Sequence, residues 1–320
     1  MYFVYLLYFV VVILIGLVLY NRLQFKEAEK QYLPKGDFIS VDGIRLHYIQ
    51  EGVGQPVVFL HGGILSSRDF EEVVRLTASK GFQAIVFDRP GYGFSERPKS
   101  EVTPIKQAQI IHSAIKELGI SEPVILVAHS WSGSMSLSYA AQYPNDVAGI
   151  MTLGAALYKE GYPAEDGDVL SKLIKAPLIG KLMLNTLLKT PLGKRMATVM
   201  VRETFKPELP PKGYIEELYA IAFRPNHFYA NREDVLTFPK ATLQISKQYS
   251  EIKHPVLIIV GEDDPFGTIE HAKRLNKELP HSNLKIQPKV AHMIPDLHPE
   301  LVVDNVVELY NNYIENSNTV

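Results

Sequence analysis

The first 21 residues contain no charged side chain, and the first charge of the chain is at Arg22. As a helix, the stretch from Tyr2 to Tyr20 would be about 29 Å long at ~1.5 Å per residue, close to the hydrocarbon thickness of a bilayer. Helices this apolar on every side are rare in soluble domains. The pattern therefore predicts a transmembrane anchor over residues 1–21.

A cleaved signal peptide is the other interpretation of this segment. Such a peptide would have a basic start, a shorter apolar region and small residues at its cleavage site, and none of these is visible before Arg22. We favour an uncleaved, single-pass anchor. Because the nearby basic side chains all follow the apolar run, the positive-inside tendency predicts that the rest of the chain is cytoplasmic; these side chains are Arg22, Lys26, Lys30 and Lys35.

After a charged, linker-like segment at 22–36, short apolar runs alternate with amphipathic stretches. Asp42-Gly43 predicts the two-residue turn of an opening β-hairpin. Nearly continuous apolar strands separated by helices predict an α/β fold, in which a mostly parallel sheet is flanked by helices. Six further strands are expected at 56–60, 82–88, 123–129, 147–154, 255–261 and 283–288, and a final helix from 298 through 314.

Residues 157–250 interrupt this alternation, because they contain helical stretches and no convincing strand. They are expected to form a helical cap inserted into the core. The predicted division is a transmembrane anchor at 1–21, a linker at 22–36, the first part of the core at 37–156, the cap at 157–250 and the second part of the core at 251–320.

Composition narrows the chemistry. With a formal net charge of −2, the chain lacks the basic excess that nucleic-acid binding would need. It has no cysteine, which excludes disulfides, thiolate metal ligands and a cysteine nucleophile. No G-x-G-x-x-G follows the early strands, so nucleotide binding is not favoured.

Ser130 directly follows the strand at 123–129 and precedes a run of small residues. A sharp strand-to-helix turn of this kind exposes a nucleophilic serine, and its usual signature is G-x-S-x-G. Here Ala128 and Ser132 replace the two glycines, and Gly133 follows at once. Taken alone, the segment also fits a serine that merely caps a helix.

Three other strand ends carry matching chemistry. His61-Gly62-Gly63 follows the strand at 56–60, where backbone amides are needed to stabilise an oxyanion; the expected donors are the amides of Gly63 and Trp131. A serine also needs a general base, and the base needs an orienting carboxylate. Asp264 lies in an acidic turn after the strand at 255–261, and His292 follows the strand at 283–288.

Two stretches, from about Asp37 to Ala156 and from His254 to Tyr313, resemble the α/β-hydrolase fold family. The matching segments are FLHGG, FDRPGYGFSERP, LVAHSWSGSMSLSYAAQYP, IIVGEDDP and VAHMIPDLHPE. The resemblance implies that the acid is the fourth residue of a G-x-x-D turn, Asp264, and that the base is the histidine before the last helix, His292. It gives the turn at 88–93 a structural role only, and it implies neither a cofactor nor a metal.

Dehalogenases and epoxide hydrolases of this family use aspartate where this chain has Ser130. The resemblance therefore favours a lipase- or esterase-like serine hydrolase that cleaves carboxylic esters through an acyl-enzyme. Cofactor-free haloperoxidases and acyltransferases share the same triad and remain alternatives. An α/β domain that only binds a partner is the alternative from a different class.

The cap offers a clue to the substrate. Residues 168–206 contain eight Lys/Arg against two acidic residues. Such a basic amphipathic surface suggests contact with anionic lipid headgroups, although a solvated helix face would have the same pattern. Residues 173–188 are rich in Leu, Ile and Met, and we expect some of them to line the substrate pocket or to meet the bilayer. The expected substrate is a small-molecule or lipid ester with a medium or long acyl chain. The membrane is the other expected partner.

Overall fold

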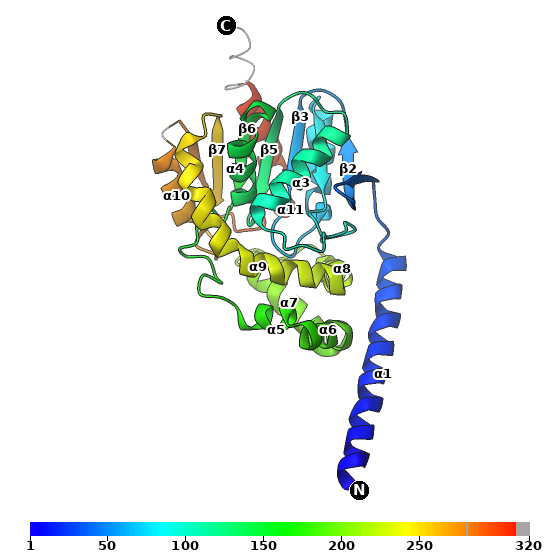
Figure 1. The fold of residues 1–320 in the computed structure, drawn as a ribbon. Coiled ribbons are helices and arrows are strands. Elements are labelled where there is room, and N and C mark those ends of the chain that lie inside the picture. Colours follow the sequence, from blue (N-terminus) through cyan, green and yellow to red (C-terminus); the bar gives the residue numbers. More distant parts are fainter. Residues whose placement is uncertain (280, 312–320) are drawn as a thin grey trace.

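A long N-terminal helix, α1 (Tyr2–Gln31), extends away from the rest of the molecule in this computed structural model, which describes residues 1–279 and 281–311 (Figure 1). By its length and by the mean hydropathy of 2.8 over an 18-residue window, this helix could cross a membrane, a test that a signal sequence or a soluble core helix also passes. It continues past Asn21 to Gln31, so most of the expected linker is helical. The reason is that Leu, Gln, Lys, Glu and Ala are strong helix formers, and no proline follows until Pro34.

The centre of the fold is one 8-stranded sheet in the order β1-β2-β4-β3-β5-β6-β7-β8. The opening hairpin pairs antiparallel, with Asp42 and Gly43 both at positive φ in its turn, and β2 pairs antiparallel with β4. All other pairs are parallel. The mostly parallel α/β sheet predicted from the sequence is thus confirmed. Its strands are β1 (Asp37–Val41), β2 (Ile44–Glu51), β3 (Pro56–Leu60), β4 (Gln83–Phe87), β5 (Val124–His129), β6 (Val147–Leu153), β7 (Val256–Gly261) and β8 (Asn283–Gln287).

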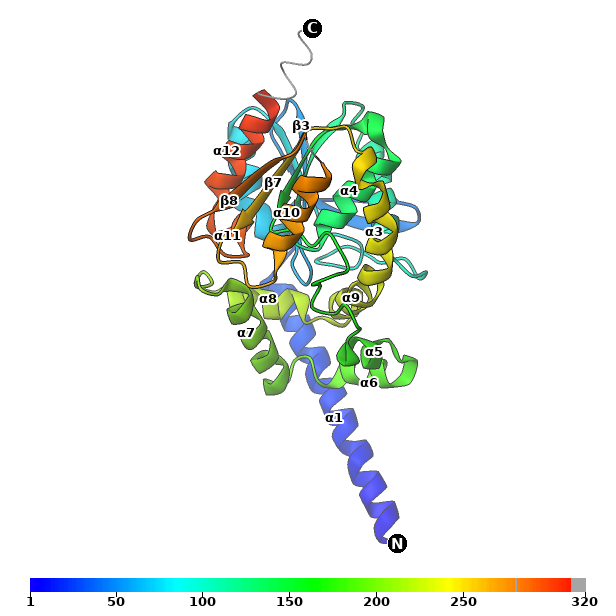
Figure 2. The same cartoon turned by 90° about the vertical axis from the view of Figure 1, so that its left-hand side faces the viewer.

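Helices cover both faces of the sheet (Figure 2). On one face the apolar sides of α2 and α12 pack on the alternate strand residues, and on the other face α3, α4 and α10 do so. The expected last helix ends at Leu309, and the part of that expectation from 312 to 314 lies outside the described residues. The helical elements of the core are η1 (Ser67–Phe70), α2 (Glu71–Ser79), α3 (Pro104–Glu117), α4 (Ser132–Gln142), η2 (Pro144–Asp146), η3 (Ser246–Glu251), α10 (Thr268–Glu278), α11 (Ile294–Leu297) and α12 (Pro299–Leu309).

The insertion between β6 and β7 is helical and lies at the end of the molecule from which α1 projects (Figures 1 and 2). Its helices enclose an apolar cluster of their own. The last of them leaves the cap, because Phe238, Ala241 and Ile245 of α9 pack into the core beside α3 and α4. The cap helices are α5 (Val169–Lys175), α6 (Pro177–Thr186), α7 (Pro191–Phe205), α8 (Tyr214–Ala222) and α9 (Pro225–Ile245).

Candidate active site

Ser130 is the first of the two residues between β5 and α4, and its φ of 52° lies in the left-handed region that non-glycine residues rarely adopt. The strained backbone is held by hydrogen bonds on both sides. The Ser130 amide donates to the Leu153 carbonyl over 2.9 Å, and the Gly133 amide donates to the Ser130 carbonyl over 3.0 Å. A side chain at Gly133 would meet the Cβ of Ala155 at 2.4 Å, so this position requires glycine.

The side chains of Ser130, His292 and Asp264 form one chain of hydrogen bonds. Nδ1 of His292 lies 2.7 Å from Oδ2 of Asp264, and Nε2 lies 2.9 Å from Oγ of Ser130. Because a carboxylate can only accept, Nδ1 carries the proton and Nε2 is free to accept from the serine hydroxyl. The three residues chosen from the sequence are therefore brought together from the ends of β5, β7 and β8.

Electrostatics keep Asp264 ionised. Burial by itself would raise the pKa of this carboxyl, but the charge of His292 and the hydrogen bonds from His292 and from the Phe266 amide outweigh it, and the pKa lies below its usual value. The loop fits tightly around the pair. A Cβ at Gly154, whose φ is +49°, would come within 2.9 Å of the carboxylate, so a larger residue there would displace Asp264.

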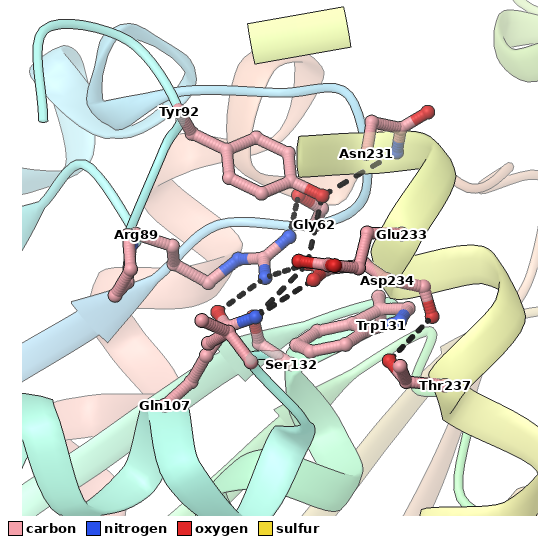
Figure 3. Close-up of polar contacts among 12 residues, drawn as sticks. Gly62, Arg89, Tyr92, Gln107, Trp131, Ser132, Asn231, Glu233, Asp234 and Thr237 are labelled. Atoms are coloured by element: carbon pink, nitrogen blue, oxygen red, sulfur yellow. Dashed lines mark hydrogen bonds and ion pairs between the residues drawn. The ribbon is translucent and has the colours of Figure 1, made fainter. Parts of the chain in front are cut away.

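The loop that contains Gly63 is held by Arg89 (Figure 3). The guanidinium donates to the His61 carbonyl over 3.0 Å and to the Gly62 carbonyl over 2.9 Å. Because a trans peptide directs its C=O and N–H to opposite sides, fixing the Gly62 carbonyl on Arg89 also fixes the direction of the Gly63 N–H. Neither the Gly63 amide nor the Trp131 amide has an acceptor among the described residues, as donors reserved for an oxyanion would require.

Arg89 is itself held by the cap. Its Nη1 lies 2.8 Å from Oδ2 of Asp234 on α9, and its guanidinium carbon lies 4.1 Å and 4.2 Å from the ring centroids of Tyr92 and Trp131. Gln107 and the Tyr92 hydroxyl donate to the same carboxylate. The sequence suggested only a structural turn at 88–93. A lone arginine in that turn carried no signal of this pair, because its partner is far away in the chain.

A second residue that sequence reasoning missed is His129, immediately before the nucleophile. Its Nε2 lies 2.9 Å from the carbonyl oxygen of His292 and donates to it. Burial, followed by the charge of His292, lowers the pKa of His129 to about 3, so the ring is neutral. His129 thus supports the backbone that carries the candidate base. The one hint in the sequence was its position directly before the serine, at the first x of the G-x-S-x-G signature.

The candidate triad opens into a cavity of about 220 Å³ that Gly63 and Trp131 also line. Its remaining lining is mostly apolar and comes in part from α7, α8 and α9, including Met200, Val201, Phe205, Leu218 and Val235, and in part from other segments, including Ile64, Leu65 and Phe266. Residues 173–188 were expected to line the pocket or to meet the bilayer, and none of them lines this cavity. The buried members of that segment, Ile174, Leu184 and Leu188, pack in the apolar cluster of the cap instead.

Among the described residues, no group of three or more His, Asp or Glu side chains is arranged to bind a metal ion. The chemistry that the arrangement can perform is proton transfer between a hydroxyl, an imidazole and a carboxylate.

Comparison with known proteins agrees with the geometry. Residues 55–173 match the alpha/beta hydrolase fold family. The chain is 26% identical over 277 residues to the uncharacterized hydrolase YugF of Bacillus subtilis, covering 84% of this chain and 95% of YugF. It is 26% identical over 276 residues to a 2-hydroxy-6-oxononadienedioate/2-hydroxy-6-oxononatrienedioate hydrolase of Burkholderia vietnamiensis, covering 80% and 88% of the two chains.

The same fold recurs in solved structures. Cfl2 from Burkholderia cenocepacia superposes with a TM-score of 0.72 at 21% identity, covering 86% of this chain and 95% of Cfl2. The fold predicted from the sequence, the matched segment and these similarities over 80–86% of the chain lead to one conclusion: this chain has the α/β-hydrolase fold, and its residues 55–173 carry the sequence pattern of that family.

Proposed function

We propose that this protein is a serine hydrolase that cleaves carboxylic esters through an acyl-enzyme, with Ser130 as nucleophile, His292 as general base and Asp264 as the orienting acid. The observation that supports the proposal most directly is the unbroken relay of 2.7 Å and 2.9 Å through the two nitrogens of His292. Its geometry is that of a nucleophile within hydrogen-bond reach of a base that a third group orients.

In the proposed reaction, Oγ of Ser130 attacks the ester carbonyl carbon while its proton moves to Nε2 of His292. The oxyanion that forms accepts hydrogen bonds from the amides of Gly63 and Trp131, which need no reorganisation. The C–O bond to the alcohol breaks, and His292 returns the proton to the departing oxygen. A water molecule, deprotonated by His292, then attacks the acyl-enzyme and releases the acid and the free serine.

The lining of the cavity supports a medium- or long-chain acyl group. Each methylene that the pocket buries contributes about 0.8 kcal/mol, so four added carbons should raise kcat/KM by roughly two orders of magnitude. Most of the exposed cavity wall is apolar, which disfavours small, strongly solvated esters. A cofactor-free haloperoxidase or an acyltransferase would use the same triad with a different second substrate.

The test is a series of p-nitrophenyl acetate, butyrate, octanoate and palmitate, assayed with the full chain below the micellar concentration of each ester. We expect kcat/KM to rise from acetate to octanoate. A steady fall from acetate upward would replace the proposal with a small-ester hydrolase, and no turnover of any ester would contradict ester cleavage itself. Adding short alcohols as competing acceptors distinguishes hydrolysis from acyl transfer.

A second candidate substrate is a carboxylate-bearing oxo-dienoate, the class that the name of the Burkholderia relative specifies. The specific observation in its favour is Arg232, which lines the otherwise mostly apolar cavity and whose Nε lies 3.1 Å from Oδ1 of Asn231. A guanidinium in that wall is suited to a carboxylate. Loss of activity on such a substrate in Arg232→Gln, with octanoate ester turnover retained, would support this alternative.

We also propose that α1 is an uncleaved, single-pass membrane anchor with the hydrolase domain on the cytoplasmic side. Its uncharged stretch before Arg22 and the basic residues that follow support this orientation. An anchor at this position would keep the active site close to lipid substrates.

A further inference from the structure

The anchor helix is packed against the cap along one side. The residues of α1 that lose exposure are Leu14, Leu17, Val18, Asn21, Phe25 and Ala28, and their recurrence every three or four residues places them on a single face. The elements that they meet are α6 and α8. Residues before Leu14 have no such neighbour and are exposed on all sides.

Asn21 joins the two helices by hydrogen bonds. Its side chain is fully buried, its Nδ2 donates to the Thr186 carbonyl over 2.9 Å, and its Oδ1 accepts from the Lys189 amide over 2.7 Å. Thr186 and Lys189 are at the end of α6 and just beyond it, where helix carbonyls and following amides lack partners. The contact therefore fixes α6 beside the last turns of the apolar segment.

This placement sets the depth of α6. If the uncharged stretch of α1 fills the hydrocarbon layer, the turns from Leu14 to Asn21 occupy its last ~11 Å, at about 1.5 Å per residue. A helix packed beside those turns lies at the boundary between headgroups and acyl chains. Cap helix α6 is in this position, whereas the sheet and α12 are at the opposite end of the molecule (Figures 1 and 2).

The surface of α6 has the composition that this boundary requires. Leu178 is 84% exposed, Ile179 52% and Leu182 45%, although nothing in the described chain covers them. Large exposed apolar side chains grouped in this way mark interaction sites. The neighbouring part of the cap, α5, α6 and the start of α7, also carries exposed basic side chains, which can extend to phosphates while their stems remain in apolar surroundings; they are Lys172, Lys181, Lys194 and Arg195.

We propose that α6 is a second membrane contact. It inserts Leu178, Ile179 and Leu182 into an anionic leaflet and thereby holds the cap against the membrane surface. The inference rests on the proposal that α1 spans the membrane, but not on the reaction. A bilayer is favoured over a protein partner because α6 packs beside α1, the helix proposed to span the membrane, and because α5 and α6 contain basic but no acidic residues. Interfacial helices of this type reach about 5–10 Å into the lipid.

The absence of cysteine allows a direct test. Single-cysteine variants Leu178→Cys, Phe9→Cys and Val53→Cys are labelled with an environment-sensitive nitrobenzoxadiazole probe and reconstituted as the full chain in phosphatidylcholine–phosphatidylglycerol vesicles. Val53 is the matched control, since it is 81% exposed and lies in the loop before β3, at the end of the sheet remote from the cap. Lipids with spin labels at different depths then quench the probe.

We expect the probe at 178 to be blue-shifted and quenched best by a shallow spin label, the probe at 9 to be quenched best by a deep label, and the probe at 53 to remain in water. Replacing phosphatidylglycerol by phosphatidylcholine should reduce quenching at 178 but not at 9. If the probe at 178 behaves like the one at 53 while the probe at 9 is quenched by a deep label, α6 does not contact the membrane. That result would leave the proposal that α1 is an anchor intact. Shielding at 178 without lipid quenching would instead indicate a protein on this surface.

Discussion

Arg89 and Asp234 form an ion pair with 2.8 Å between Nη1 and Oδ2, and neither side chain has any exposed surface. One partner lies in the turn after β4 and the other in the first half of α9, so the pair connects the core to the cap (Figure 3). Because Arg89 has no other anionic partner among the described residues and also donates to the carbonyls of His61 and Gly62, the cap contributes to the shape of the candidate oxyanion site.

Removing the charge of Asp234 should therefore be costly. Asp234→Ala leaves Arg89 buried with no counter-charge, and breaking such a pair typically costs about 3–5 kcal/mol. We expect a large fall in the denaturant midpoint, measured by circular dichroism. Asp263→Asn, at an exposed position two residues after β7, is the control and should leave the midpoint unchanged. A stability loss below ~1 kcal/mol in Asp234→Ala would show that water replaces the carboxylate.

Ser130→Ala should lower kcat by about 10⁴–10⁶-fold while the melting temperature is retained. The physical reason is that no other hydroxyl lies within hydrogen-bond distance of Nε2 of His292 among the described residues. A fluorophosphonate probe followed by peptide mass spectrometry should label Ser130 in the parent protein. Labelling of Ser132, whose hydroxyl donates to the His61 carbonyl over 2.5 Å, would mean that the nucleophile is misassigned.

Asp264→Asn should reduce kcat by roughly 10⁴-fold, because the amide no longer favours the tautomer with the proton on Nδ1 and does not stabilise the imidazolium. Turnover of the best ester is the measurement. The same Asp263→Asn variant serves here as the neighbouring control and should keep full activity. If instead Asp263→Asn is the impaired variant, the acid has been assigned to the wrong carboxylate.

Stability should depend on pH through the pair of carboxyls at Asp69 and Asp296, beneath the cap residue Tyr214. Burial raises the pKa of Asp69 to about 6, and burial together with the charge of Asp69 raises the pKa of Asp296 well above its usual value. The folded protein thus keeps protons that the unfolded chain has already released. The contribution of this pair to stability is therefore greatest near pH 4 and below. It decreases as the pH rises from about 4 through 6 and beyond.

Asp296→Asn tests this linkage, since an amide can donate to Asp69 at every pH. The fall in melting temperature between about pH 5 and pH 8, followed by calorimetry, should become shallower than in the parent protein. Asp304→Asn, on the exposed side of α12, should reproduce the parent slope. An unchanged slope in Asp296→Asn would show that the pair does not hold a proton in the folded state.

Protease treatment of intact cells or spheroplasts checks the orientation of the anchor. With the basic residues after α1's apolar stretch retained inside, the hydrolase domain should resist digestion until the membrane is lysed. Digestion before lysis would reverse the assignment. A mature N-terminus well beyond Asn21, measured by mass spectrometry, would instead show that the segment is a cleaved signal.

The sequence by itself determined the α/β fold and its sheet. Alternation of apolar strands with amphipathic helices, together with turn residues such as Asp42-Gly43, is a local signal that survives in the folded chain. It also nominated Ser130, Asp264 and His292, because in a parallel sheet residues that follow strands reach the same edge whatever their separation in sequence. The distances then show that these three side chains do meet.

Only the tertiary structure decided which distant residues become partners. Arg89 and Asp234 are 145 positions apart, and Asn21 meets Thr186 over a separation of 165, so no local pattern indicates either contact. For the same reason the sequence could not decide whether the apolar run at 173–188 lines the pocket or meets the bilayer, and the cavity is lined by other residues, among them those of α7, α8 and α9. Periodicity shows that a helix has an apolar face, but packing against other elements decides whether that face meets a substrate, the protein core or its surroundings.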